Sequence, residues 1–374
     1  MSVRKALIVG GGPAGMTTSI ALARQGVECE LVEINTHWRP AGVGIGLQSA
    51  PLRALKALDL LDPVVAASYP HAEIEMLRAD GVQLGVMPQV NVNGPGDPPF
   101  VAMSRMALHE VLERRLDQLG VAVQLGLTVD ELSEEADGVR AVFDDGTDDV
   151  FDLVIGADGM HSHVRGLLLP DTPAPEYAGQ VIWRIGVSRP AELERYTIMI
   201  AGPTRVGLVP IADDRLYMWM LDNTLPPERP PRERLVELFQ ERMAAYAGFA
   251  PEVAAQIGEP DQIDFRALHW VLVPPPWHAG RVLLLGDAAH ATTPHLAFGV
   301  GLAIEDAVVL GELVADGCDP VDVGERLALR RFERCRLVVE NSLQLSRWEQ
   351  APDTPGADPG ALIGATMREL AKPI

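Results

Sequence analysis

The chain has 374 residues, of which 31 are basic and 52 acidic, so its formal net charge is −21. This acidity argues against binding to nucleic acid and to an anionic membrane surface. The three cysteines, Cys29, Cys318 and Cys335, lack the spacing of a metal site or a disulfide framework, so we expect a reduced cytoplasmic protein without a metal. We expect neither a signal peptide nor a transmembrane span, because the apolar stretch near the start is broken by glycines and a proline.

The first 33 residues predict a strand, a glycine-rich turn, a helix and a second strand. Gly10, Gly12 and Gly15 form a GxGxxG turn between the first strand and the helix, and Glu33 ends the second strand. Such glycines allow the backbone to approach a pyrophosphate, and an acid at this distance can accept hydrogen bonds from a ribose. A tight turn can also need glycine for steric reasons alone. In this context we predict dinucleotide binding.

The next elements alternate between helices and short strands. A helical pattern over 52–61 is followed by strand-like runs over 72–86. Ser104 and Gly120 are the expected N-cap and C′ residues of a helix between them. A hairpin and a buried strand are then predicted over 139–159.

From about residue 178 the pattern changes to strands separated by turns, which indicates an antiparallel sheet. A helix over 231–249 and a strand over 262–272 follow, and the last long helix is predicted over 322–348. The stretch 351–360 is rich in Pro, Gly and Asp, and we expect it to be loosely ordered. The segments that predict strands of this sheet are 180–188, 196–202, 205–211 and 216–223.

Two further motifs follow apolar strands. The first, GADGMHSHVR at 156–165, also fits an ordinary turn in which Ser162 caps a helix and Arg165 is solvated. The second, at 283–306, places Asp287 after a strand and Gly299 and Gly301 at the start of a helix. Backbone donors and one carboxylate placed in this way point to a bound ligand.

In this order and at these separations, the three motifs resemble the fingerprint of the flavin-dependent aromatic hydroxylases related to p-hydroxybenzoate hydroxylase and salicylate hydroxylase. The resemblance implies an α/β fold, with a Rossmann-like FAD-binding domain built on a parallel sheet and a substrate domain built on an antiparallel sheet. The expected division is 1–72, 100–177 and 275–350 for the FAD-binding domain, 73–99 and 178–274 for the substrate-binding domain, and 351–374 for a C-terminal tail.

The resemblance also implies the cofactor contacts. Gly10, Gly12 and Gly15 would approach the FAD pyrophosphate, and Glu33 its adenosine ribose. Arg39 and Arg105 stand where similar enzymes place arginines near the FAD phosphates and ribose, although Arg39 could also be a solvated loop residue. Asp158 would support FAD and the visiting nicotinamide nucleotide, and Asp287 would accept from a ribitol hydroxyl. Pro294, Gly299 and Gly301 would lie beside the isoalloxazine ring. The sequence departs from the family at Val300, where relatives often have a polar residue, and at Ser49-Ala50, where they often have Pro-Asn.

His295 is the candidate base, because a neutral imidazole beside the flavin can take a phenolic proton. A histidine that satisfies loop carbonyls is an equally valid interpretation, and we expect His290 to be structural, hydrogen-bonded to loop backbone. Arg184 could anchor a carboxylate or face solvent. Alternation places Met218 and Met220 on one face of a strand and Trp219 on the other. The expected substrate contacts are Trp183, Arg184, Met218 and Met220.

The resemblance thus implies an FAD-dependent monooxygenase that hydroxylates an aromatic or heteroaromatic ring with O₂ and NADH or NADPH, through a flavin C4a-hydroperoxide. The alternatives are a flavin-linked reductase or dehydrogenase, a halogenase or epoxidase on the same fold, and a non-catalytic dinucleotide-binding module. A homodimer is compatible with the sequence, which fixes neither the oligomeric state nor the substrate.

Overall fold

The computed structural model describes residues 2–38 and 42–374, and its first layer is a six-stranded sheet. All neighbouring strands in it are parallel except β18 and β19, the pair at one edge of the sheet. The βαβ unit predicted at the start of the chain is confirmed. The strand order is β18 (His278–Ala279), β19 (Val282–Leu284), β12 (Leu153–Gly156), β1 (Lys5–Val9), β2 (Glu28–Glu33) and β8 (Ala122–Leu125).

Helices cover this sheet, and their apolar side chains share a buried core with those of the strands. Helix α4 has the predicted caps: the Ser104 hydroxyl accepts from the Ala107 N–H, and Gly120 is left-handed. The helices of this region are α1 (Pro13–Ala23), α2 (Ser49–Ala57), α3 (Leu61–Ala66), α4 (Arg105–Leu119), α5 (His163–Leu168), α8 (Asp287–His290) and α9 (Gly299–Ala315), with a 3-10 turn η3 (Pro294–Leu296) between the last two.

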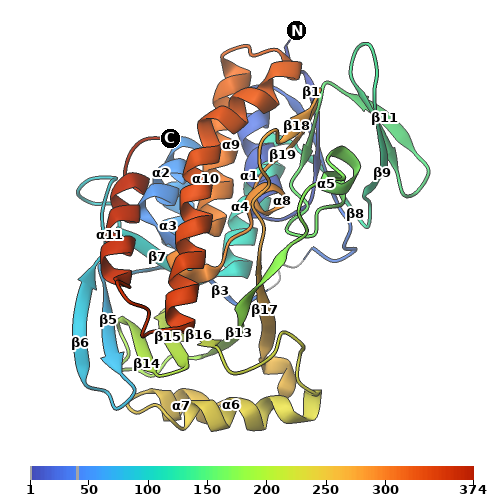
Figure 1. Ribbon diagram of the computed structural model, residues 1–374. Coiled ribbons are helices and arrows are strands. Elements are labelled where there is room, and N and C mark those ends of the chain that lie inside the picture. The colour runs from blue at the N-terminus through green and yellow to red at the C-terminus, as the bar shows by residue number, and fades with distance from the viewer. Residues whose placement is uncertain (1, 39–41) are drawn as a thin grey trace.

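Two small sheets complete this half of the molecule. One contains β3 (Gly44–Gln48), β7 (Phe100–Ser104) and β4 (Tyr69–Pro70), and lies between the six-stranded sheet and the lower half of the molecule in Figure 1. The other contains β9 (Val129–Glu134), β10 (Val139–Phe143) and β11 (Asp148–Phe151), which projects at the edge. The predicted hairpin over 139–151 is confirmed.

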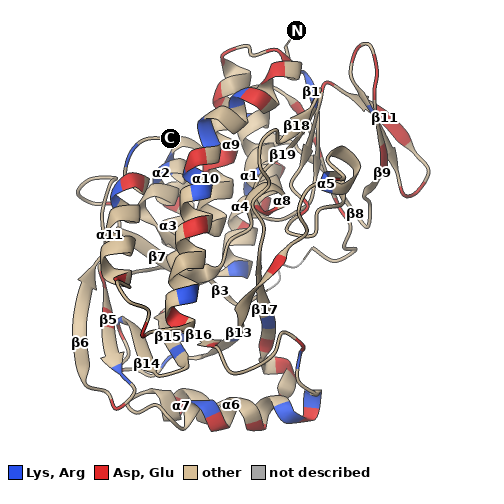
Figure 2. Ribbon diagram, viewed as in Figure 1, with Lys and Arg blue, Asp and Glu red and all other residues tan. Residues whose placement is uncertain are grey.

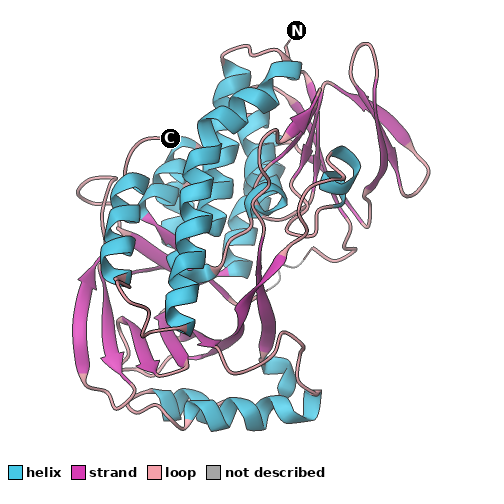
Figure 3. Cartoon of the chain, in the orientation of Figure 1, coloured by secondary structure: helices cyan, strands magenta, loops and turns pink. Residues whose placement is uncertain are grey.

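The second large sheet has seven strands, and its neighbours are antiparallel except for β14 and β5. This confirms the antiparallel sheet expected from residue 178 onward. Helices α6 and α7 lie along its outer face (Figure 3). The strand order is β17 (Asp264–Trp270), β13 (Glu176–Ser188), β16 (Arg215–Asp222), β15 (Thr204–Pro210), β14 (Tyr196–Ala201), β5 (Glu73–Arg78) and β6 (Gln83–Pro88).

The helix predicted over 231–249 is shorter and broken. It consists of η1 (Arg232–Arg234) and α6 (Leu235–Met243), followed by a turn, α7 (Ala250–Ala255) and η2 (Pro260–Gln262). Leu235, Phe239 and Met243 of α6 are buried against the sheet. Tyr246, in the turn after α6, is buried in the same core, so the chain leaves the helix where this side chain turns inward.

Helix α10 (Pro320–Gln350) runs from the six-stranded sheet to the second sheet, with acidic and basic residues along its length (Figure 2). After the exposed stretch at 351–356, the chain forms α11 (Pro359–Leu370), a helix that the sequence interpretation missed. In the described part of the chain, no helix combines the length and apolarity needed to cross a bilayer. The division into an FAD-binding domain, a substrate-binding domain and a C-terminal tail stays a prediction.

Candidate active site

The three sequence motifs converge at the carboxyl ends of β1, β12 and β19. Gly10 has φ +112°, and a Cβ there would lie 2.5 Å from the Ala157 carbonyl oxygen, so the first motif is packed directly on the second. Arg165 joins the second motif to the third, because its guanidinium donates to the carbonyl oxygens of Met160 and Ala288 at 2.7 and 2.8 Å. Arg165 is therefore buried, and the solvated position considered for it is wrong.

The start of α1 is an open anion site. Gly12 is its N-cap, and no side chain caps the helix. A Cβ on Gly12 would meet nothing within 4 Å, so space is open in front of the helix. The adjoining pocket has a volume of about 220 Å³ and is lined by Gly11, Gly12, Pro13, Met16, Glu33, Asn35, His37, Trp38, Ile45, Arg105, Leu108 and His109. Uncapped N–H groups and the helix dipole favour a phosphate at such a position.

Glu33 ends β2, as predicted, and its side chain lines this pocket. Its carboxylate accepts from the N–H groups of Gly11 and Asn35 at 2.8 and 2.9 Å. Trp38 closes the same wall, because its indole N–H donates to the Gly11 carbonyl at 2.8 Å and its ring packs edge-on against His109. Sequence interpretation missed both aromatic residues, since only the fold brings α4 beside the glycine turn.

Arg105 is the first residue of α4 and points into the space between the two halves of the molecule. Its Nε is buried without a hydrogen-bond partner. Burial, and then the nearby Arg184, lower the pKa of its guanidinium, while Tyr217 and Asp287 act in the opposite direction. A half-buried guanidinium whose Nε has no hydrogen-bond partner among the described residues fits an anionic ligand such as a phosphate or an electron-rich flavin edge. Arg39, the other predicted arginine, lies outside the described residues.

Asp158 belongs to the loop beneath Gly10. Its carboxylate accepts from the Ser162 hydroxyl and from the Val164 N–H, which fixes the loop before α5. Ser162 in turn caps α5 by accepting from the Arg165 N–H at 2.9 Å. The turn chemistry considered for this motif is thus present, and it places Asp158 at the contact with the glycine turn.

Asp287 is the first residue of α8 and follows Gly286, which has φ +61°. Asp287 is exposed to solvent, and partial desolvation by the surrounding protein raises the pKa of its carboxyl. Helix α9 begins at Gly299 without a side-chain cap, and Pro294 begins the preceding turn η3. A Cβ on Gly301 would collide with Pro51 of α2, so Gly301 allows these helices to approach closely.

One face of the seven-stranded sheet is turned toward these residues. Tyr217 and Trp219 of β16 lie on it, beside Arg184 and Arg205 of the neighbouring strands. The ring of Tyr217 lies directly against Gly44 of β3, because a Cβ on Gly44 would collide with that ring. Arg184 is paired with Asp264 at 2.8 Å, so the solvent-facing alternative for Arg184 is wrong. The Arg205 guanidinium lies 5.5 Å from the Trp219 ring centre.

His295 lies at the other end of this face. Its Nε2 is 3.2 Å from Glu349 of α10, and its Nδ1 is 3.0 Å from the Thr293 hydroxyl. Glu349 also approaches Arg205 at 3.3 Å. Only 1% of the His295 side chain is exposed, and this burial lowers the pKa of the ring even though Glu349 favours the charged form. His295 is therefore neutral near pH 7, as a base must be, but both nitrogens already face protein groups.

The residue types and their positions fit FAD. An uncapped helix start, open space at Gly12 and a half-buried arginine whose Nε has no hydrogen-bond partner among the described residues match a pyrophosphate-containing anion. A model of the FAD binding domain family matches residues 4–319. The FAD-dependent urate hydroxylase of Klebsiella oxytoca is 32% identical over 98% of this chain and 94% of its own length. The chain belongs to the FAD-dependent aromatic hydroxylases.

Other members of the family agree with this assignment. The 3-amino-4-hydroxybenzoate 2-monooxygenase of Streptomyces platensis is 34% identical over 88% of this chain and 83% of its own length. Among solved structures, Klebsiella pneumoniae HpxO complexed with FAD and uric acid has a TM-score of 0.86 and 26% identity, covering 98% of this chain and 92% of HpxO. The prediction of an FAD-dependent monooxygenase with the p-hydroxybenzoate hydroxylase fold is confirmed.

The predicted substrate contacts need a correction within this family assignment. Trp183, Met218 and Met220 lie together in the core beneath α6 and α7, on the face opposite Tyr217 and Trp219. All three are fully buried there, so this placement gives them no access to the flavin side. The alternation of Met218 and Met220 against Trp219 is confirmed, and the face that carries Trp219 is the one on which Tyr217 lies against Gly44.

His290 also differs from the expectation. Its Nε2 lies 2.7 Å from the Asp306 carboxylate instead of contacting loop backbone. Although burial opposes a charged ring, Cys335 and Asp306 raise the pKa of His290 well above its usual value. His290, Asp306 and Cys335 have potential metal-ligand atoms within 4.8 Å of one another. However, the Arg331 guanidinium donates to Asp306 at 2.7 Å, so a fixed cation already occupies the carboxylate.

Proposed function

We propose that the substrate is a small hydroxylated heteroaromatic ring that carries an ionisable hydroxyl or ring N–H and no carboxylate. The observation that carries this proposal is the pairing of charges on the Trp219 face. Arg184 is matched by Asp264 at 2.8 Å, and Arg205 by Glu349 at 3.3 Å. Neither of these two arginines beside Trp219 is therefore free to receive a substrate carboxylate.

Aromatic side chains on this face supply the binding surface. Tyr217 is 9% exposed and Trp219 is half-buried, so both rings are held in place by their surroundings. Planar rings are expected to stack on such side chains, with Arg205 near enough to polarise an acceptor oxygen. The urate hydroxylase relative and HpxO with uric acid support a heteroaromatic substrate of this kind.

We assign the cofactor contacts to the residues predicted from the sequence. Gly10, Gly12, Gly15, Glu33, Arg105 and Asp158 would hold the dinucleotide, and Asp287, Pro294, Gly299 and Gly301 would face the flavin end. Bound FAD would supply hydride acceptance from NADH or NADPH and the activation of O₂. The protein's own part is to bind and orient the ring, to exclude water and to take the substrate proton.

His295 remains the candidate base, with a mechanism refined by its contacts. The Glu349 carboxylate accepts a hydrogen bond best if Nε2 carries the ring proton, which leaves Nδ1 as the acceptor beside Thr293. A substrate hydroxyl would take the place of the Thr293 hydroxyl at Nδ1. Glu349 would then stabilise the imidazolium that forms.

The test is NAD(P)H oxidation by the FAD-loaded protein, first without oxygen and then with ¹⁸O₂. The panel pairs ring compounds without a carboxylate, such as urate and hydroxyquinolones, with hydroxybenzoates and hydroxypyridine carboxylates. We expect faster flavin reduction and ¹⁸O-labelled product with the first group. Turnover of carboxylates alone would overturn the substrate class, and reduction without labelled product would favour a reductase.

A further inference from the structure

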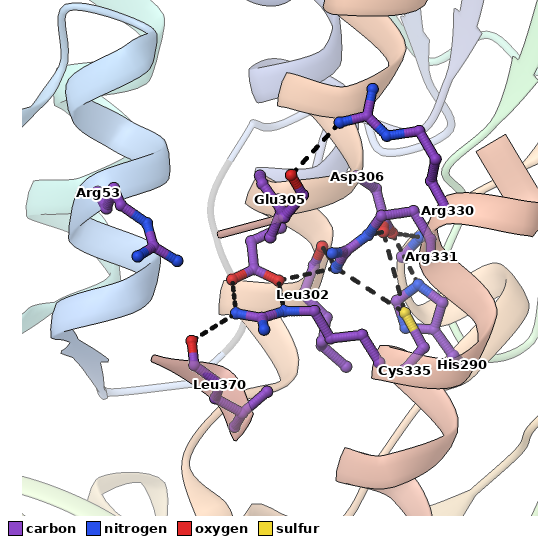
Figure 4. Close-up of polar contacts among 12 residues, drawn as sticks. Arg53, His290, Leu302, Glu305, Asp306, Arg330, Arg331, Cys335 and Leu370 are labelled. Atoms are coloured by element: carbon purple, nitrogen blue, oxygen red, sulfur yellow. Dashed lines mark hydrogen bonds and ion pairs between the residues drawn. The ribbon is translucent and has the colours of Figure 1, made fainter. Parts of the chain in front are cut away.

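A cluster of buried charges joins three helices behind the flavin side of the molecule. Glu305 and Asp306 lie in the second turn of α9, Arg331 and Arg334 on α10, and His290 on α8 (Figure 4). Arg331 contacts Asp306 at 2.7 Å and Glu305 at 2.9 Å, and Arg334 forms a two-pronged pair with Glu305 at 2.7 Å. Glu305, Asp306 and Arg331 are inaccessible to solvent.

At one end, the cluster holds the turn that carries Asp287. The Asp306 carboxylate accepts from the Gly286 N–H at 3.1 Å and from His290 at 2.7 Å. Gly286 adopts φ +61°, and a Cβ there would lie 2.9 Å from Ala14 of α1. The position of Asp287 is thus set by a hydrogen bond from α9, the helix whose first residues are predicted to face the flavin.

At the other end, the cluster reaches the C-terminal helix α11. Arg334 donates to the carbonyl oxygens of Leu370 at 2.7 Å and Glu369 at 3.3 Å. Arg53 of α2 donates to the next two carbonyls, those of Ala371 and Lys372, at 2.9 and 2.6 Å. The last carbonyls of a helix carry partial negative charge and lack donors within the helix. Arg334 and Arg53 supply these donors and so hold the C-terminal end of α11 in place.

Helix α11 packs one side on the core, where Thr366 and Leu370 are buried and Leu362, Ile363 and Met367 are half-buried. The connection at 351–356 is exposed throughout, so the arginine contacts at the far end add a second attachment. Leu370 and Met367 line a small cavity together with Phe298, the residue before α9, and Gln48, the residue before α2. The end of α11 therefore lies against the starts of both helices that meet at Gly301.

We infer that α11 acts as a clasp, a terminal helix whose attachment holds the flavin site in place. Arg334 is the positioning residue, because it binds both the end of α11 and Glu305 of α9. Arg331 connects Glu305 to Asp306, which in turn holds the Asp287 turn. The inference assumes that Asp287 and the start of α9 bind FAD, as proposed above. Docking of α11 then sets how firmly FAD is held. Residues that never touch the cofactor control its retention.

The test uses full-length Arg334→Met. This substitution keeps the aliphatic stem and leaves Glu305 paired with Arg331, so no buried carboxylate loses its last partner. Because Arg334→Met removes charged hydrogen bonds to both α9 and the end of α11, we expect FAD to bind roughly tenfold more weakly. Binding is followed by quenching of flavin fluorescence as apoprotein is titrated, and the flavin environment by visible circular dichroism.

Two further variants separate positioning from general stability. Arg334→Lys retains a cation and should recover part of both the affinity and the dichroism signal. Arg336→Met is the matched control, because Arg336 lies on the same helix and, among the described residues, forms its ion pairs with the exposed Glu333 and Glu340. It should bind FAD like the wild type.

The clasp makes a second prediction about coupling. In a chain shortened to end at residue 356, Arg334→Met should cause a smaller additional loss of FAD affinity than in the full chain, because its carbonyl partners are already gone and only its pair with Glu305 remains. An equal loss in full-length and shortened chains would overturn the clasp, as would normal FAD binding by full-length Arg334→Met. Wild-type protein without affinity for FAD would overturn the flavin site as well, so the two failures are distinguishable.

Discussion

At the scale of single residues, the electrostatic effect with a testable consequence for stability is at Asp287. The surrounding protein raises the pKa of its carboxyl, but the residue is exposed to solvent, so ionisation of this group destabilises the apoprotein only slightly. The stabilising contribution of a protonated Asp287 is present below the pKa of the unfolded chain and is lost as pH rises through the folded pKa.

Asp287→Asn should therefore separate stability from cofactor binding. We expect the variant apoprotein to melt at a higher temperature than wild type at pH 7, and the difference to shrink as the pH is lowered toward 4. Binding of FAD should weaken about tenfold, because a neutral amide accepts a weaker hydrogen bond from a ribitol hydroxyl. Calorimetry of both apoproteins over this pH range checks the first part, and fluorescence titration checks the second. A variant less stable than wild type at every pH would contradict the desolvation argument.

His295 can be tested by a substitution that keeps its shape. In His295→Gln the side-chain amide can still donate to Glu349 but cannot take a proton, so hydroxylation should fall by about 10²–10⁴-fold while substrate affinity changes little. The pH dependence of single-turnover hydroxylation should lose its acidic limb. His295→Gln with wild-type rates and an unchanged pH profile would assign the ring a structural role beside Thr293.

At the scale of elements, strand β15 is shaped to receive Trp219. A Cβ on Gly207 would collide with the Trp219 ring, so glycine allows the indole to lie flat against the sheet. Gly207→Ala should cost about 1–3 kcal/mol and displace the indole, which raises KM for the substrate more than it lowers kcat. Near-ultraviolet circular dichroism should report the displaced indole. Gly85→Ala in β6 is the control, since no heavy atom lies within 4 Å of its added methyl.

Elements with strong local signals were predictable from the sequence, and long-range pairings were not. Ser104 and Gly120 bound α4 as expected, because caps depend on neighbouring residues. Glu349 lies on α10, 54 residues beyond His295 in the chain, and no local pattern indicates that they meet. The lining face of β16 was equally undetermined, because both of its faces are apolar. Helix α11 was missed because its polar, glycine-rich start resembles a tail.

At the scale of the whole molecule, α10 ties the two large sheets into one structure. Its Gln350 donates to the Ala178 carbonyl of β13 at 2.9 Å, and its Arg331 and Arg334 hold α9. We therefore expect heat to unfold both halves together. Added FAD should raise the free energy of unfolding by about 1.4 kcal/mol for each tenfold excess over Kd, because it binds only the folded chain. Scanning calorimetry with rising FAD should show one transition that moves upward. A second, FAD-independent transition would indicate that the second sheet unfolds alone.

The order of strands in the six-stranded sheet has a consequence for synthesis on the ribosome. Strand β19 pairs with β12, although more than 120 residues of other structure separate them, and α1 is covered by α9 from the same late segment. A nascent chain that has emerged only to residue 270 exposes the unpaired edge of β12 and the apolar side of α1. Such surfaces favour aggregation and attract chaperones. We expect ribosome-bound chains to be protease-sensitive until α9 and α10 have left the exit tunnel, so the order of translation decides when the flavin site can first close.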